Sequence, residues 1–216
     1  MEPPVFRPAG GRSAPPSNTD RLATRSQSRD GQNRTTMKTL GTLAYRAMGA
    51  AVLDASMYEG IEADGAATRQ ALAVVLLASV AAGIGASGWA GPHWAVLVSF
   101  GVLALVTWVG WAVLILHVGG RYFREPQTHV DLGELLRTVG FAAAPGLLQA
   151  VAIVPFLTVP AFAISWLWML AAMVVAVQHA LDFHSTIRAA FVCAVALALA
   201  VTLAVLLGLS LSRTVT

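Results

Sequence analysis

Residues 138–181 read TVGFAAAPGLLQAVAIVPFLTVPAFAISWLWMLAAMVVAVQHAL, a run of 44 residues without an Asp, Glu, Lys or Arg. An α-helix needs about 20 apolar residues to cross a bilayer, so this run is long enough to cross twice. Pro155 and Pro160 flank four residues near its centre. Proline interrupts a helix because it lacks the amide proton and its ring clashes with the preceding turn. The run therefore predicts two helices joined by a tight hairpin, in preference to one long re-entrant segment.

Two further runs, residues 70–120 and 189–212, also lack acidic and basic side chains. The first is long enough for two crossings and contains the turn-forming segment SGWAGPHWA (87–95), whereas the second fits one crossing. Hydrophobic residues make up 56% of the chain, charged residues 12%, and the mean hydropathy is +0.68. This composition predicts an all-α integral membrane protein. We expect its five transmembrane helices over residues 71–89, 95–118, 139–156, 160–180 and 189–211.

The first third of the chain is polar and precedes the transmembrane domain, which is predicted over 71–211. Residues 1–36 are rich in Pro, Gly, Ser and Arg. Such a segment cannot bury enough apolar surface to offset its ordering entropy, so we expect a disordered tail. Two interpretations of this tail remain open, because Met37 is an alternative start of the protein. Residues 37–70 are expected to form a short cytoplasmic or interfacial helical segment.

This helical segment has two parts. Apolar residues recur at helical spacing from Leu40 to Ala51, which indicates either an amphipathic helix at the membrane surface or a connecting helix. The second part, LDASMYEGIEAD (53–64), contains four acidic residues. Asp54 is placed to cap a helix, because a side-chain oxygen at that position accepts a hydrogen bond from a free backbone amide. Tyr58 and Ile61 then share the apolar face of that helix.

The basic residues predict the orientation in the membrane. Nine of the 14 Lys and Arg residues precede the first apolar run, and the others lie beside the gaps between runs. With a cytoplasmic N-terminus, 13 of the 14 face the cytoplasm and only Arg213 lies outside. We therefore predict that the C-terminus is outside. This distribution explains the net charge of +3 without a nucleic-acid partner. Abundant Ala, and Arg in place of Lys, indicate a GC-rich bacterial genome, so we expect the protein in a bacterial inner (cytoplasmic) membrane.

Polar side chains are expected to gather at the cytoplasmic ends of the helices. His179 and Asp182 are three residues apart and share a face of the fourth span, and Arg188 precedes the fifth. Such groups can bind an anionic headgroup, a partner, a metal or a proton. The alternative is that they reach water and anchor the helix ends. The candidate interaction residues are Asp54, Tyr58, Glu59, His179, Asp182 and Arg188.

Gln149 is the candidate polar residue inside the membrane. It lies between Pro145 and Pro155, so we expect its helix to be kinked or locally unwound. Its amide either lines a route through the membrane or forms a hydrogen bond between helices. The predicted spans contain no Asp, Glu, Lys or Arg, which argues against a proton-coupled carrier.

The sequence carries no motif that is typical of an enzyme. We find no phosphate loop, zinc-ligand spacing, nucleophile elbow or dinucleotide fingerprint. The single cysteine, Cys193, allows neither an intramolecular disulfide nor a thiolate metal cluster. We therefore expect no catalytic residue, no cofactor-binding residue and no metal ligand, and a protein that is not an enzyme.

A series of features follows the first charged loop. In order, they are Leu136-Arg137, Gly140-Phe141, Ala144-Pro145, the proline-bounded hairpin, Trp166-x-Trp168 and AVQHALDFHSTIRAA (176–190). This series resembles the Yip (Ypt-interacting protein) domain family in its bacterial branch, and LDASMYEGIEAD resembles the same members. The resemblance covers about residues 52–211. The family typically has Gly-Tyr-x-x-x-Pro where this chain has Gly140, Phe141 and Pro145, so the tyrosine hydroxyl is absent here.

The resemblance implies a cytoplasmic N-terminus and five helices, in agreement with the positions of the charges. Eukaryotic relatives are membrane-trafficking proteins that engage small GTPases and shape membranes. We therefore expect a non-enzymatic membrane-organising or protein-interaction role, with the lipid bilayer and an unidentified membrane or cytoplasmic protein as partners. The alternative is a small permease or transporter subunit in which Gln149 and the prolines line a route. A membrane-embedded enzyme ranks third, because the spans lack a cluster of titratable groups.

Overall fold

A computed structural model of the protein describes residues 18–90, 94–122 and 132–214. Within these ranges the elements are seven α-helices and one 3₁₀ helix, without a strand. The predicted all-α fold class is therefore confirmed. The chain divides into two compact units, Met1–Thr42 and Leu43–Thr216, and each is described by itself.

The described part of the first unit belongs to helix α1 (Asn18–Ala51), which continues into the second unit. The helix begins inside the segment for which the composition predicts disorder, and residues 1–17 lie outside the described residues. Residues 36–42 are all exposed. The hydroxyls of Thr36 and Thr42 donate hydrogen bonds to carbonyls four residues earlier. Residues 36–42 of α1 therefore make local hydrogen bonds and bury little surface. The prediction of disorder rests on the same property, that this segment buries little apolar surface.

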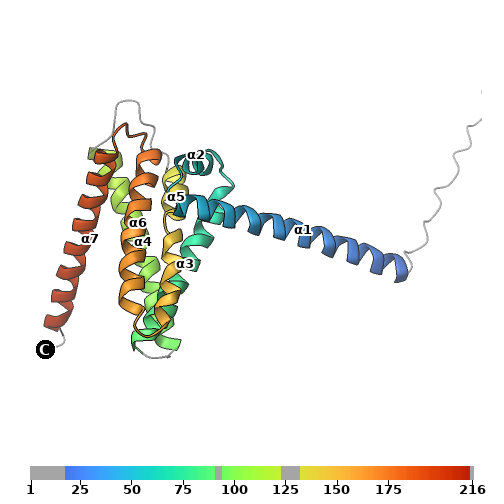
Figure 1. The fold of residues 1–216 in the computed structure, drawn as a ribbon, viewed down its shortest axis with the longest axis horizontal. Coiled ribbons are helices and arrows are strands. Elements are labelled where there is room, and N and C mark those ends of the chain that lie inside the picture. Colours follow the sequence, from blue (N-terminus) through green and yellow to red (C-terminus); the bar gives the residue numbers. More distant parts are fainter. Residues whose placement is uncertain (1–17, 91–93, 123–131, 215–216) are drawn as a thin grey trace, which may run out of the picture. The chain divides into compact units, whose positions relative to one another are not determined.

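The second unit is a bundle of apolar helices (Figure 1). Four described segments are long and apolar enough to cross a membrane. They belong to α3 (Ala67–Ala90), α4 (Trp94–Tyr122), α5 (Leu132–Phe141) with the 3₁₀ helix η1 (Ala144–Ile153), and α6 (Thr158–Ala180). Helix α7 (Thr186–Thr214) adds a shorter described apolar part, residues 186–200. Four of the five predicted spans lie inside these helices, and the third differs.

The third span begins at Leu132, seven residues before the predicted start at 139. The two starts differ because the predicted span follows a charge-free run, whereas Glu134 and Arg137 lie in the first turns of α5. After Phe141 the chain continues as a 3₁₀ helix with Pro145 in its first turn. The regular α-helix is therefore interrupted around Gln149, where the sequence predicts a kink or local unwinding, but the segment is the more tightly wound 3₁₀ form.

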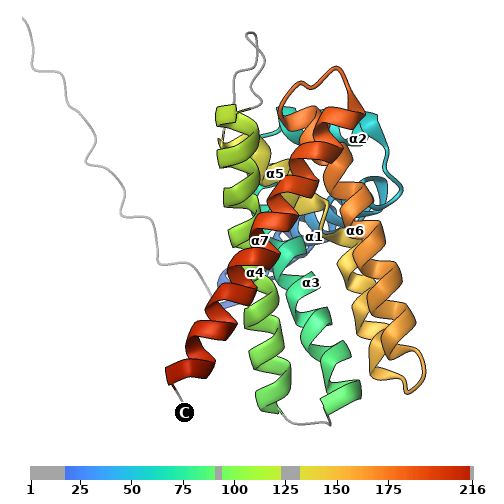
Figure 2. The same ribbon diagram turned by 90° about the vertical axis from the view of Figure 1, so that its left-hand side faces the viewer.

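Helix α3 lies at the centre of the bundle, where it contacts α4, α5, η1 and α6. Helix α7 packs against α4 and α6 and crosses α4 (Figure 2). The short helix α2 (Ala55–Ala63) packs against α5 and α6 at one end of the bundle. Close approach of α3 to η1 depends on Gly85, because a Cβ there would overlap the backbone carbonyl oxygen of Gln149. We refer below to the end that carries α2 as the polar end.

Candidate functional site

Helix α2 starts at the polar end with the predicted cap. The Asp54 side chain accepts hydrogen bonds from the Ser56 amide at 3.0 Å and from its hydroxyl at 2.7 Å. These bonds hold the pKa of the Asp54 carboxyl below its usual value, the hydroxyl contributing most. Tyr58 and Ile61 are both fully buried on the inner face. The predicted cap and apolar face are thus confirmed.

Tyr58 fastens α2 to the bundle. Its hydroxyl donates to the Ala50 carbonyl at 3.1 Å, and the Ala172 carbonyl lies at 3.4 Å as a second acceptor. Its ring stacks on that of His179, with centroids 6.3 Å apart and planes 4° apart. Burial raises the pKa of the phenol. The structure therefore brings two predicted site residues together, and it places Tyr58 where a soluble partner has no access.

Arg46 joins the end of α1 to the start of α3. Its guanidinium donates to the Asp64 carboxylate at 2.6 Å and to the Gln70 side-chain oxygen at 3.0 Å. The hydrogen bond from Arg46 is the main cause of the lowered pKa of Asp64. Because Asp64 is 38% exposed, this ion pair contributes little stability by itself.

Arg137 and Glu62 form a second link, which sequence reasoning missed. The Arg137 side chain is 9% exposed, and its Nη2 donates to the Glu62 backbone carbonyl at 2.7 Å. The Nε atom of Arg137 has no hydrogen-bond partner among the described residues. Spacing gave no signal for this contact, because the two residues are 75 positions apart.

Three further carboxylates lie close enough to Glu62 for their charges to act on it. Burial is the main cause that raises the pKa of Glu62 to about 7, and the nearby charges of Asp182, Glu134 and Glu59 raise it further, while Arg137 lowers it. The charges come from α2, α5 and the turn after α6. We call these four residues, Glu59, Glu62, Glu134 and Asp182, the acidic cluster. No group of three His, Cys, Asp or Glu side chains within 18–90, 94–122 and 132–214 is arranged to hold a metal ion.

The remaining predicted interaction residues are exposed at the same end. Asp182 follows α6 with a left-handed φ of 49°, and its amide donates to the His179 carbonyl at 3.0 Å. Glu59 lies on the outer face of α2, and Arg188 lies in the first turn of α7. The structure thus joins Tyr58 to His179 and places Asp182 near Glu62, whereas an interaction role for any of these residues stays a prediction.

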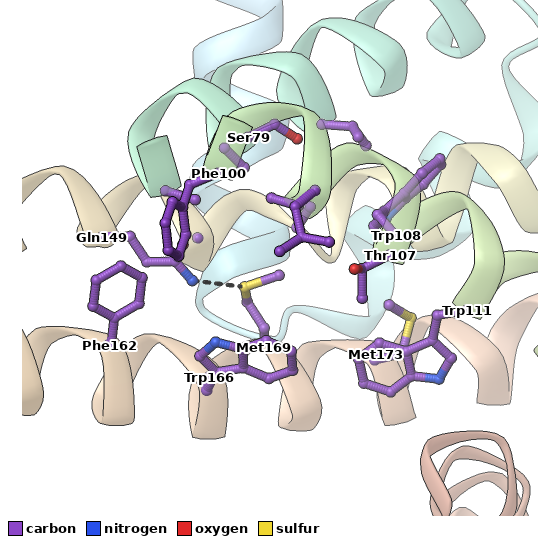
Figure 3. A pocket seen from close by; sticks show the side chains of 17 residues that line it. Ser79, Phe100, Thr107, Trp108, Trp111, Gln149, Phe162, Trp166, Met169 and Met173 are labelled. Atoms are coloured by element: carbon purple, nitrogen blue, oxygen red, sulfur yellow. Dashed lines mark hydrogen bonds between the residues drawn. The ribbon is translucent and has the colours of Figure 1, made fainter. Parts of the chain in front are cut away.

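Gln149 lies elsewhere, beside a cavity of about 270 Å³ within the spans. Residues of α3, α4, η1 and α6 line this cavity (Figure 3). Gln149 is 5% exposed, and its amide nitrogen donates to the Met169 sulfur at 3.8 Å. That contact joins η1 to α6, as the hydrogen-bond interpretation predicts, but a thioether is a weak acceptor.

The fold and the positions of the charges define a multi-pass, all-helical membrane protein. The family comparison is more specific: the Yip1 domain model matches residues 55–207. The chain belongs to the Yip1 domain family, as its motifs predict. No curated protein and no solved structure matches the chain.

Proposed function

We propose that this Yip1-domain protein is a non-enzymatic, membrane-organising or protein-interaction component of a bacterial inner membrane. The main observation that supports this proposal is the acidic cluster, whose residues come from three separate elements at the polar end. The opposite end of the bundle differs. The hairpin between η1 and α6, the end of α3 and the described start of α4 contain no Asp, Glu, Lys or Arg. A basic surface on a cytoplasmic protein, or on the cytoplasmic part of a membrane protein, has the complementary charge.

Three considerations support, in turn, the cytoplasmic placement of this end, the absence of enzymatic chemistry and a surface suited to a partner. The basic residues favour a cytoplasmic N-terminus. In the described spans Asp, Glu, Lys and Arg occur only near one end, as Arg69 in α3 and as Glu134 and Arg137 in α5, so no such side chain is available as an acid or base in the middle of the membrane. Tyr58, Arg46 and Arg137 hold neighbouring elements together, so a rigid surface is presented to a partner.

Affinity purification in mild detergent, followed by identification of co-purifying proteins, tests the interaction. The informative variant removes exposed charge and keeps the fold, so it combines Asp54→Asn, Glu59→Gln and Asp182→Asn. Asparagine caps a helix as well as aspartate does, and it tolerates the left-handed backbone of residue 182. Tyr58 is left unchanged because it is buried.

We expect the triple variant to lose partners that the wild-type protein retains. The matched control combines Glu2→Gln, Asp20→Asn and Asp30→Asn, which also removes three acidic charges, all from the first unit. The control should retain the partners. Recovery of the same proteins with the triple variant would contradict the proposed surface.

The alternative function, a small permease or transporter subunit, is favoured by the cavity beside Gln149. Reconstituted vesicles that show solute flux, lost on Gln149→Leu, would support it. If the vesicles show no flux for any solute of a broad panel, this result would count against a permease.

A further inference from the structure

The cavity runs along two helices. On α6, Phe162, Trp166, Met169 and Met173 follow one stripe of the helix. Phe162 and Met173 are 11 positions apart, so the stripe is about 16 Å long at the rise of an α-helix. Helix α4 provides a parallel stripe from Phe100 to Trp111. The cavity is therefore elongated along the bundle (Figure 3).

The mouth of the cavity faces the membrane interior. Leu103 on α4 is 59% exposed and Trp166 on α6 is 40% exposed, and both belong to segments that are apolar and long enough to span a bilayer. Opposite the mouth, Ala78, Ala82 and Gly146 leave room because their side chains are small. In a bilayer, the mouth of the cavity therefore contacts the hydrocarbon chains of the lipids.

The lining favours an uncharged, largely apolar occupant. It contains no Asp, Glu, Lys, Arg or His. Its polar atoms belong to Ser79, Thr107, Gln149 and the tryptophan indoles, and the indole N–H groups of Trp108 and Trp111 are buried without a hydrogen-bond partner among the described residues. Gln149 lies toward the Phe162 end, while Trp111 and Met173 lie at the opposite end (Figure 3). The Gln149 amide nitrogen reaches only the Met169 sulfur, and its oxygen accepts no hydrogen bond from a described residue. An amide that is 95% buried without a good partner is costly, and more so away from water.

We propose that this cavity binds one hydrocarbon chain of a bilayer lipid, which enters between α4 and α6 and places an ester or hydroxyl group at Gln149. The chain fills the apolar stripe toward Trp111. The polar group of the lipid supplies the hydrogen-bond partner that Gln149 lacks. A volume of about 270 Å³, just below the usual range for ligand pockets, admits one chain and leaves the rest of the lipid in the bilayer.

Photolabelling of the full-length protein in vesicles tests this site. The probes carry a diazirine in an acyl chain and are supplied as a diacylglycerol and as a phosphatidylglycerol, which distinguishes a neutral lipid from a phospholipid as the source of the chain. Peptide mass spectrometry should find the label on the stripe that includes Met169 and Met173. Excess unlabelled lipid should suppress this labelling several-fold.

Two variants locate the chain and its polar group. Ala104→Phe places a bulky side chain in the cavity and should abolish labelling of the stripe. Val106→Phe adds a phenyl group two residues away, where the side chain is 61% exposed and outside the lining, and should leave labelling unchanged. Gln149→Leu should remove the preference for the ester probes over a plain diazirine alkane.

Each variant is first checked for helical circular dichroism and monodisperse elution. If Ala104→Phe fails this check, the competition experiment on the wild-type protein decides. Labelling that excess lipid does not suppress, or label spread evenly over the outward faces of α4 and α6, would overturn the proposal.

Discussion

At the scale of single residues, neighbours in the sequence have opposite roles at the polar end. Tyr58 is fully buried and holds α2 to the bundle, whereas Glu59 beside it is exposed. Arg137 likewise does not extend into water as a charged side chain at a helix end is expected to do. It is 9% exposed and donates a hydrogen bond to the Glu62 carbonyl. Residue type alone does not separate these roles, because it is the packing of α2 against α5 and α6 that decides which side chains are covered.

Glu62 should make the stability of the protein depend on pH. Its folded pKa of about 7 lies above its ordinary value of 4.5, so the folded state binds the proton more tightly than the unfolded state does. The resulting stabilisation is full below about pH 4.5 and is lost as the pH rises through about 7. We expect the melting temperature in detergent to fall mainly between about pH 4.5 and pH 7. Glu62→Gln, which resembles the protonated side chain, should remove most of this fall.

Asp54→Asn is the control for this pH dependence. The lowered pKa of Asp54 keeps its carboxyl ionised across the tested range, so this variant should retain the wild-type slope. A slope that persists unchanged in Glu62→Gln would show that another group is responsible.

At the scale of elements, the sequence predicts helices better than it predicts their ends. The charge-free runs locate each span because ionised side chains are costly inside a bilayer. They leave out the start of α5, where the Arg137 Nη2 atom donates a hydrogen bond to the Glu62 carbonyl within the protein. The break in the α-helix at η1 was predictable from Pro145 and Pro155, since a proline supplies no amide proton. Its close packing on α3 depends on Gly85.

Gly85→Ala should therefore destabilise the bundle. The added Cβ would overlap the Gln149 carbonyl oxygen, and because that atom belongs to the backbone, η1 must shift as a whole. We expect a loss of about 1–3 kcal/mol, typical of overpacking, measured by equilibrium unfolding in mixed micelles.

Gly110→Ala provides the matched control on α4, where a Cβ meets nothing within 4 Å. It should be neutral or slightly stabilising, because alanine favours the helix more than glycine does. Equal stability of the two variants would contradict the tight contact between α3 and η1.

At the scale of the whole molecule, the sequence predicts the membrane-spanning class and family, but it does not predict which helices touch. The Trp168 indole donates to the Ala51 carbonyl across 117 positions, and Tyr58 reaches Ala172 across 114. Helical periodicity shows which side of a helix is apolar, yet it does not identify the partner of that side. The cavity beside Gln149 was missed for the same reason, because it exists only where four elements meet.

The orientation of the bundle is testable with single cysteines. Cys193 is the only cysteine in the sequence and is buried, so Cys193→Ala provides the background. Glu59→Cys marks the polar end, and Phe156→Cys marks the hairpin, where Phe156 is 97% exposed. Phe156 already adopts a φ of 72° with a Cβ, so cysteine adds no new backbone strain there.

We expect a membrane-impermeant maleimide to label Phe156→Cys in intact cells and Glu59→Cys only after permeabilisation. The reason is that the basic residues lie beside the loops on the α2 side, and such loops remain in the cytoplasm. The reverse labelling pattern would show that the protein has the opposite orientation in the membrane. It would place the acidic cluster outside the cell, so a cytoplasmic partner could no longer reach that surface.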